Sequence, residues 1–240
     1  MLAGGAAISW RPPVEYPTGY GDLRPQDEAR YAAQREKMVT RQIERRGIDD
    51  RRVLAAMRAV PRHRFVPADE IRQAYTDSPL PIGYGQTISQ PFIVAYMCEM
   101  ALLDTGSRVL EVGTGSGYHA AVMAQIADTV YTIEIIPELA DRAGATLSSL
   151  EYGNIETRTA DGYYGWPEAA PFDAIVVTAA PEHIPPPLVQ QLAEGGRMVI
   201  PVGHPFLTQY LVLVEKKNGR VTSRQLIPVR FVPLTGRHDQ

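Results

Sequence analysis

The sequence has little cysteine and no long apolar run. Its one cysteine, Cys98, can form no internal disulfide and cannot build a zinc site alone, so we expect a small buried core residue. No apolar run reaches the ~18–20 residues that span a bilayer. The apolar opening, residues 1–8, lacks the basic stretch that starts a signal peptide. These features favour a cytoplasmic protein without membrane contact, and a processed, exported form stays open as the alternative.

The chain also lacks an excess of charge of either sign. Its 24 Lys and Arg residues against 27 Asp and Glu residues give a formal net charge of −3, which supplies no general attraction to nucleic acid. The five histidines are scattered without metal-ligand spacing, and no G-x-S-x-G elbow or Cys–His arrangement suggests a hydrolase. We therefore predict no metal site and no nucleic-acid partner. A hydrophobic fraction of 45% indicates a globular chain and excludes general disorder.

Three stretches of different character follow one another. Residues 1–26 are rich in proline, glycine and aromatics, and we expect an irregular arm. Residues 27–240 are expected to form a single domain, with helices and a loop-rich part over 27–103 and a sheet over 104–240. In the first part, the pattern predicts a helix from Asp27 to about Gly47, a second one capped by Asp49 or Asp50 and stopped by Pro61, a loop over 61–85, and a helix over 91–103.

The second part alternates strands with helices. Strands are expected over 108–112, 129–135, 155–159, 172–178 and 197–201, and helices over 117–126, 137–150 and 186–192, the last ended by Gly195 and Gly196. Such repeats predict an α/β fold with a doubly wound, mostly parallel, Rossmann-like sheet. Two alternating runs, 209–215 and 221–227, flank Asn218-Gly219, which is the strongest short hairpin signal. We therefore expect the sheet to end in an antiparallel hairpin.

A glycine loop joins the first of these strands to the helix that follows. Gly113, Gly115 and Gly117 let the backbone pass close to a ligand at a helix N-terminus. Glu134 ends the next strand, and a carboxylate at this spacing typically accepts the ribose hydroxyls of a nucleoside cofactor. A tight turn without a ligand is the alternative.

The glycine spacing distinguishes between cofactors. A dinucleotide fingerprint would need glycine at position 118, where Tyr118 stands. The form G-x-G-x-G with Glu111 ahead of it instead resembles the first motif of class I S-adenosylmethionine-dependent methyltransferases. That resemblance implies S-adenosyl-L-methionine as cofactor. It places near the cofactor Glu111, Gly113, Thr114, Gly115, Ser116, Gly117 and Glu134, together with Asp161 and Gly162 after the third strand, where an acid commonly receives the adenine amino group. On its own, Asp161 would be an ordinary turn residue.

The substrate is indicated by the loop over residues 77–91, DSPLPIGYGQTISQP. With the GTGSG loop it resembles the signature of the protein-L-isoaspartate O-methyltransferase family. Further matches lie at residues 46–49, 60–67, 161–166, 172–181 and 229–235, so the resemblance covers roughly residues 34–235. It implies a methyltransferase domain that acts as a monomer on isoaspartyl-containing proteins and peptides. The enzyme would methylate the free α-carboxyl of an isoaspartyl residue, and the ester would then collapse to a succinimide.

The same resemblance assigns roles within the loop and near the C-terminus. Ser89 matches the active-site serine of the family, and Gln86, Thr87 and Ile88 match positions that touch the cofactor or substrate. Thr235 matches a threonine near the cofactor pocket. Gly85 and Thr178 join Thr87 and Ser89 as predicted contacts of the acceptor. The alternative for Ser89 is that it only caps the helix starting near Pro91.

The chemistry is consistent with these residues. A carboxylate with a pKa near ~3.9 is already ionised at neutral pH, so its oxygen needs no general base. The chain must hold that oxygen in line with the methyl carbon at ~3–3.5 Å and exclude water. Backbone N–H groups over residues 85–88 and the hydroxyls of Thr87 and Ser89 are neutral donors suited to this. Two alternatives remain: methyl transfer to a different carboxylate, and a cofactor-binding adaptor without turnover.

Overall fold

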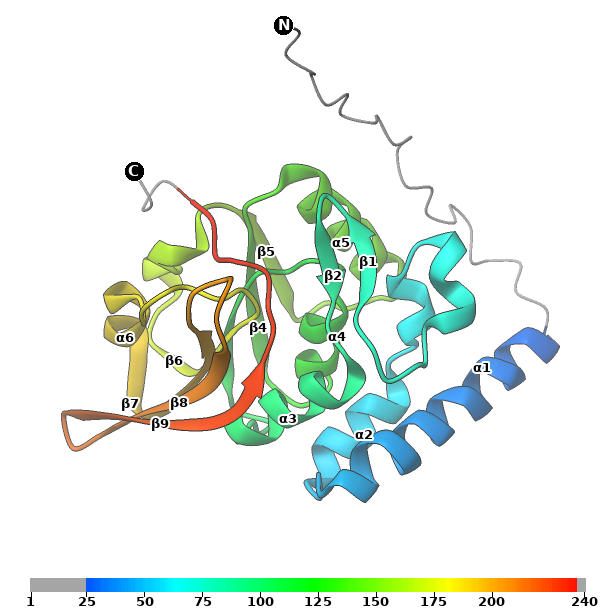
Figure 1. Cartoon of the computed structure of the whole chain (residues 1–240), viewed down its shortest axis with the longest axis horizontal. Coiled ribbons are helices and arrows are strands. Elements are labelled where there is room, and N and C mark those ends of the chain that lie inside the picture. The colour runs from blue at the N-terminus through cyan, green and yellow to red at the C-terminus, as the bar shows by residue number, and fades with distance from the viewer. Residues whose placement is uncertain (1–24, 237–240) are drawn as a thin grey trace, which may run out of the picture.

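The structure, a computed structural model, describes residues 25–236. A seven-stranded sheet with the order β5-β4-β3-β6-β7-β8-β9 forms its centre (Figure 1). The first five strands in this order pair in parallel, whereas β8 pairs antiparallel with both β7 and β9. The predicted fold class is therefore confirmed. The strands are β3 (Arg108–Val112), β4 (Thr129–Glu134), β5 (Ile155–Thr159), β6 (Phe172–Val177), β7 (Leu192–Val202), β8 (Gln209–Lys217) and β9 (Arg220–Val229).

Helices cover both faces of the sheet. One face carries α3, α4 and α5, with α1 and α2 packed outside them, and the other carries α6 and two 3-10 turns. The helices are α1 (Pro25–Met38), α2 (Arg51–Ala59), α3 (Pro91–Ala101), α4 (Tyr118–Ala124), α5 (Pro137–Ser149) and α6 (Pro186–Gln191). The 3-10 turns on the second face are η6 (Gly162–Tyr164) and η7 (Pro167–Ala169).

The core follows from the period of two along each strand. On β6, Ala174 and Val176 join the cluster under α3 and α4, whereas Ile175 and Val177 join the cluster on the α6 face. All four are at most 1% exposed. Burying a side chain of the size of valine or isoleucine contributes about 1.5–3 kcal/mol, so a strand that is apolar on both sides is stable only in the middle of the sheet.

The N-terminal helices agree with the sequence pattern in their caps. The Asp50 side chain accepts hydrogen bonds from the backbone N–H groups of Arg52 and Val53, as expected of an N-cap. The first helix continues from α1 through a π turn over residues 39–43 and a 3-10 turn over 44–46, and Gly47 ends it at φ +94°. Of the expected arm, residues 1–24 lie outside the described residues, and Pro25 and Gln26 already belong to α1.

The prediction of a loop over residues 61–85 was wrong in part. This stretch contains two 3-10 turns, η4 (Arg62–Phe65) and η5 (Ala68–Gln73), and the strand β1 (Leu80–Gly83), which pairs with β2 (Gln86–Ile88). Each 3-10 turn follows a proline that stands at its N-cap. The sequence pattern did not predict the β1–β2 hairpin, because only Leu80 and Ile82 show the alternation of buried and exposed residues that is typical of a strand.

The expected end of α6 was also wrong. The helix ends at Gln191, and β7 already begins at Leu192, so Gly195 and Gly196 lie inside a strand. The register against β6 shifts at this point, and Gly195 has φ +84°. A Cβ at Gly196 would stand 3.0 Å from the Asp173 carbonyl oxygen. The two glycines therefore form a bulge that keeps β7 paired with β6.

The remaining elements agree with expectation. Asn218 and Gly219 both have positive φ, +53° and +69°, which joins β8 and β9 in the predicted hairpin. No helix within residues 25–236 is long and apolar enough to cross a membrane. β3 and β6 are neighbours in the sheet, although β4 and β5 come between them in the chain. The chain after β3 therefore continues toward one edge of the sheet, and the chain after β6 continues toward the other edge. Such a switch point opens a crevice at the carboxyl ends of the strands.

Candidate cofactor and acceptor site

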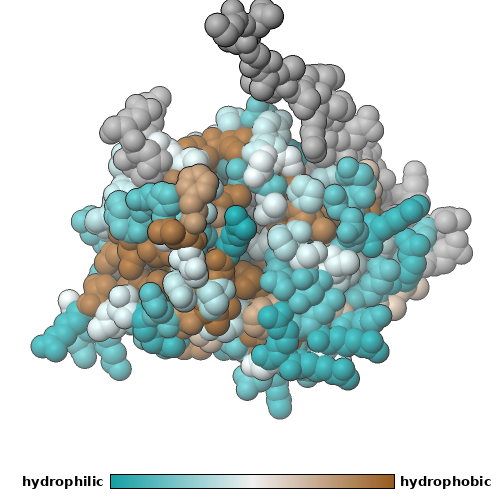
Figure 2. All heavy atoms as spheres, in the orientation of Figure 1, coloured by the Kyte–Doolittle hydropathy of each residue, from teal (hydrophilic) through white to brown (hydrophobic). Residues whose placement is uncertain are grey.

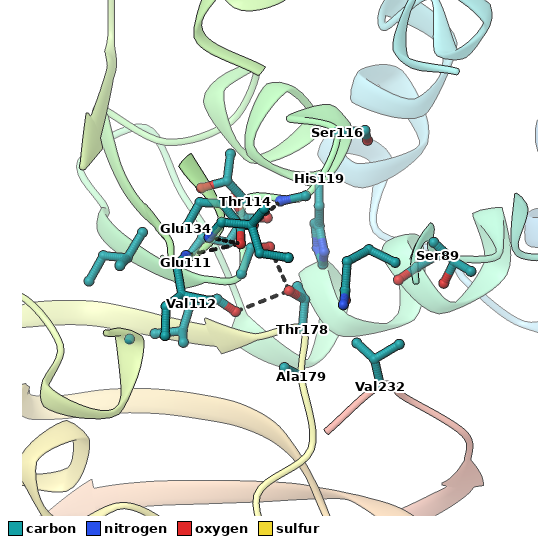
Figure 3. A pocket seen from close by; sticks show the side chains of 18 of the residues that line it. Ser89, Glu111, Val112, Thr114, Ser116, His119, Glu134, Thr178, Ala179 and Val232 are labelled. Atoms are coloured by element: carbon teal, nitrogen blue, oxygen red, sulfur yellow. Dashed lines mark hydrogen bonds between the residues drawn. The ribbon is translucent and has the colours of Figure 1, made fainter. Parts of the chain in front are cut away.

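A cavity of about 800 Å³, measured with its open mouth, lies at this switch point. Most residues predicted from the sequence meet there. They come from β2 and the segment before α3, from β3 and the glycine loop, from the end of β4, from η6, and from the segments after β6 and β9 (Figure 3). The predicted residues that line it are Gln86, Thr87, Ile88, Ser89, Glu111, Gly113, Thr114, Gly115, Ser116, Glu134, Gly162, Thr178 and Thr235.

Three predicted residues do not line the cavity, although each neighbours a lining residue in the chain. Gly85 lies in the β1–β2 turn at φ +70°. Gly117 is the N-cap of α4 at φ +85°, and a Cβ there would stand 3.3 Å from Leu147 of α5, so its lack of a side chain serves helix packing. The Asp161 carboxylate accepts the Tyr163 backbone N–H at 3.0 Å as the N-cap of η6.

Glu134 anchors the glycine loop from the end of β4. Its Oε2 accepts the Gly115 N–H at 2.8 Å, and its Oε1 accepts the N–H groups of Ile135 and Ile136 at 2.9 and 3.0 Å. The side chain is only 6% exposed. These three bonds fix the carboxylate at the cavity wall, where its remaining lone pairs can accept hydroxyl donors.

Glu111 lies on β3 beneath the glycine loop and is fully buried. Its Oε2 accepts the Thr132 hydroxyl, whose oxygen lies 2.6 Å from that of Thr114. Its Oε1 is buried and has no hydrogen-bond partner in the described part of the chain, and Glu111 is among the residues that line the cavity. Burial raises the pKa of Glu111 to about 8, and the nearby Glu134 acts in the same direction. The unpartnered oxygen can accept an N–H group of a ligand, and a ligand with positive charge would lower this pKa again.

Thr178 holds the opposite side of the glycine loop. Its hydroxyl donates to the Gly113 carbonyl at 2.6 Å and approaches the Val112 carbonyl at 3.0 Å (Figure 3). A Cβ at Gly113 would stand 2.3 Å from this hydroxyl oxygen. Glycine is therefore required here both by φ, which is +97°, and by the close approach of Thr178.

His119 was missed by the sequence analysis, which treated the histidines as scattered. Its ring enters the cavity from α4, and Nε2 lies 3.3 Å from Cys98 Sγ. Burial lowers the pKa of His119 to about 3, so the ring is neutral at physiological pH. Nδ1 has no partner among the described residues. The one available signal was a single polar residue in the otherwise apolar start of α4, directly after the glycine loop.

Ser89 faces the cavity from the two-residue segment between β2 and α3, across from Glu111 and Glu134 (Figure 3). The N-cap of α3 is Gln90, and no side chain caps this end. The alternative in which Ser89 caps the helix is therefore wrong. Cys98, by contrast, is a fully buried residue of α3, as expected.

The residues present fit S-adenosylmethionine. Glu134 offers a fixed acceptor for ribose hydroxyls, and the buried Glu111 Oε1 would gain a partner from a cationic ligand. Ile135 and Ile136 follow Glu134 in the wall and supply apolar surface for a base. Within residues 25–236, no cluster of histidine, cysteine and acidic side chains could hold a metal ion.

Comparison with known proteins identifies the family. The model of the family described as protein-L-isoaspartate(D-aspartate) O-methyltransferase matches residues 33–239. Protein-L-isoaspartate O-methyltransferase 1 of Nitrosospira multiformis is 59% identical over 91% of this chain and 94% of its own length.

Solved structures agree. One named protein-L-isoaspartate O-methyltransferase has a TM-score of 0.78 at 31% identity over 84% of this chain and 66% of that chain. A Plasmodium falciparum structure of the same name, in complex with S-adenosyl-L-homocysteine, has a TM-score of 0.74 at 30% identity over 84% of this chain and 98% of that chain. The chain therefore belongs to the protein-L-isoaspartate(D-aspartate) O-methyltransferase family.

Proposed function

We propose that this chain transfers the methyl group of S-adenosylmethionine to the free α-carboxyl of L-isoaspartyl residues in damaged proteins and peptides. One observation carries the proposal. A single cavity has the acids Glu111 and Glu134 on one side and the neutral hydroxyl donor Ser89 on the other (Figure 3), and the hydroxyl of Thr87 belongs to a further lining residue. The first side suits a cationic nucleoside, and the second suits an anionic oxygen.

On the donor side, the residues of the chain bind and orient the cofactor, and they do not have to activate its methyl group. Glu134 is held by three backbone N–H groups and would receive the ribose hydroxyls without rearrangement. The glycine loop lets the backbone at Gly113 and Gly115 approach the ligand closely. Asp161, next to the lining residue Gly162, is proposed to receive the adenine amino group. When bound, the sulfonium supplies a methyl group that is already electrophilic.

On the acceptor side, the chain orients an oxygen that is already ionised. Ser89 Oγ and the N–H groups of β2 are neutral donors that can hold a carboxylate without neutralising it. No lysine or arginine is among the described residues that line the cavity. A guanidinium there would pair with the carboxylate and lower its charge density. The absence of a paired base beside Ser89 fits this chemistry, because no proton has to be removed.

Water is kept from the reacting atoms by two segments. The β1–β2 hairpin contributes residues 86–88 to one wall, and residues 232–235 contribute to the other. The second segment is tied to the chain after β6, because Ala180 N–H donates to the Val232 carbonyl at 2.8 Å and Leu234 N–H donates to the Ala180 carbonyl at 2.9 Å. A dry cavity strengthens the attraction between the anionic oxygen and the cationic donor.

Methyl transfer to matched peptides tests the function. Two peptides of the same sequence, one with isoaspartate and one with aspartate, are incubated with the chain and radiolabelled S-adenosylmethionine. Label should enter only the isoaspartyl peptide. Equal labelling of both peptides would show a different carboxylate acceptor. Binding of the cofactor without transfer to either peptide would favour the adaptor without turnover.

We further propose that the chain works as a monomer in the cytoplasm and takes no nucleic acid as substrate. The near balance of 24 basic and 27 acidic residues supports the last point, because it gives no general attraction to a polyanion. Sedimentation equilibrium of the full chain tests the oligomeric state. A mass of two chains at micromolar concentration would contradict it.

A further inference from the structure

The loop over residues 203–208, between β7 and β8, carries two large apolar side chains that are almost fully exposed. Phe206 is 89% exposed and Leu207 is 74% exposed, more than any other large apolar side chain in the part of the chain that the structure describes. Single exposed apolar residues are ordinary, but two adjacent ones at this exposure form a patch that water solvates poorly.

Both ends of this loop are hydrogen-bonded to segments that lead into the walls of the proposed methyl-transfer cavity. At its start, the Gly203 N–H donates to the Pro181 carbonyl at 3.0 Å, three residues after Thr178. After its end, the Gln209 side chain accepts the Phe231 N–H at 2.6 Å and donates to the Phe231 carbonyl at 3.3 Å. Phe231 directly precedes Val232, which lines the cavity. In Figure 1 the orange loop rises beside the red segment that follows β9.

The tip of the loop is a formed turn. The Leu207 N–H donates to the His204 carbonyl at 3.0 Å, and the Phe206 N–H donates to His204 Nδ1 at 3.2 Å. His204 Nε2 in turn lies 3.7 Å from Glu182 Oε1, close to Pro181. These contacts hold the backbone of the tip. The Phe206 ring lies 5.4 Å from the His204 ring, and both apolar side chains stay largely exposed. The loop therefore presents two exposed apolar side chains on a formed turn, whose ends are tied to segments that lead into the cavity wall.

The acceptor explains what such a surface would bind. An isoaspartyl carboxyl is one group of a polypeptide, so the residues on either side of it must pass over the rim of the cavity. An extended chain advances ~3.3 Å per residue, so residues a few positions from the acceptor reach the neighbouring loops. Figure 2 shows further apolar side chains over the region of β8, β9 and the segment after β9, where Leu226, Ile227, Val229 and Phe231 are only partly buried.

We propose that Phe206 and Leu207 dock the polypeptide that carries the acceptor, by contacting an apolar side chain within a few residues of the isoaspartate. This inference rests on the proposed function. It makes loop 203–208 a specificity element that binds the substrate outside the cavity and takes no part in cofactor binding. The occupant is an extended peptide segment, and a second copy of this chain or a lipid surface is the alternative that the test must exclude.

The double variant Phe206→Ser/Leu207→Ser tests this. Two isoaspartyl peptides are compared, one with leucine or phenylalanine on both sides of the acceptor and one with only glycine and serine there. The variant should raise KM about tenfold for the apolar peptide, leave kcat and the Kd for S-adenosylmethionine unchanged, and leave the polar peptide unaffected. Phe206→Leu/Leu207→Phe should restore the KM. Val221→Ser, at a residue 46% exposed on β9, serves as the matched control and should change nothing.

Each other outcome overturns the inference. An unchanged KM for the apolar peptide, or the same rise in KM for both peptides, would show that the loop does not contact the residues beside the isoaspartate. A wild type that sediments as a dimer while the double variant is monomeric would assign the patch to a second copy. Binding of wild type, but not of the variant, to phosphatidylcholine vesicles would assign it to lipid. If wild type methylates neither peptide, the proposed function itself fails.

Discussion

The replacement of Glu134 by glutamine is the most direct test of the donor side of the cavity. Glutamine keeps the shape of the side chain but removes its charge and replaces one acceptor oxygen with an NH₂ group. In the folded chain, both oxygens of Glu134 accept backbone N–H groups, from Gly115 on one side and from Ile135 and Ile136 on the other. Whichever way the amide turns, at least one of these N–H groups loses its acceptor.

The expected loss of affinity follows from the bonds concerned. A hydrogen bond to a charged group contributes about 1.5–3 kcal/mol, and each 1.4 kcal/mol changes a dissociation constant about tenfold. Loss of the charged acceptor for the ribose hydroxyls should therefore raise the Kd for S-adenosylmethionine by about 10- to 150-fold. The loosened glycine loop acts in the same direction, because Gly115 would no longer be fixed.

Calorimetric titration with S-adenosylmethionine measures the effect. Glu138→Gln in the first turn of α5 is the matched control, since Glu138 is exposed and the charge change is the same. Thermal unfolding should show that both variants are folded. An unchanged Kd for Glu134→Gln would remove Glu134 from the donor site and with it the main argument for a nucleoside cofactor.

Three further expectations concern single side chains. Ser89→Ala should lower kcat by about 2- to 13-fold, which corresponds to the loss of one neutral hydrogen bond, and should leave the Kd for S-adenosylmethionine unchanged. Ser223→Ala is the exposed control, and equal rates for wild type and Ser89→Ala would exclude Ser89 from the reaction. The pKa of Glu111 is raised to about 8, so between about pH 5 and 8 the folded state keeps a proton that the unfolded chain releases, and the free energy of unfolding falls as pH rises. Urea denaturation at pH 5 and pH 8 should show a smaller fall for Glu111→Gln, and an equal fall would refute this assignment. Burial raises the pKa of the Cys98 thiol far above its usual range, so an aromatic disulfide reagent should label one thiol per chain only after denaturation, and rapid labelling of the folded chain would contradict its burial.

Much of the sheet could be predicted because its signals are local. Arg108–Val112 and Ile155–Thr159 were predicted with their observed bounds, since each is a short run between turn residues. The Asn218-Gly219 turn was equally clear, because few residue pairs adopt positive φ at both positions. These signals depend on the residue types themselves and not on the segments that pack around them.

The missed features depend on contacts between distant segments. The glycines at 195 and 196 look like a helix end, and only the pairing of β7 with β6 turns them into a bulge. The packing role of Gly117 against α5 could not be predicted either, because it depends on the position of Leu147, 30 residues further along the chain. His119 has no motif of its own, and it reaches the cavity because α4 starts directly behind the glycine loop.

The charges around the cavity also set the order in which its two ligands can enter. Two like charges ~6 Å apart repel by about 3 kcal/mol at an effective dielectric constant of ~20. An acceptor carboxylate that entered first would meet Glu134 without compensation, whereas Glu111, with its pKa of about 8, is mostly protonated at neutral pH and adds little repulsion. A cation bound against Glu134 would offset this repulsion. The charge of Glu134 that would select a sulfonium donor therefore also favours binding of that donor before the acceptor approaches.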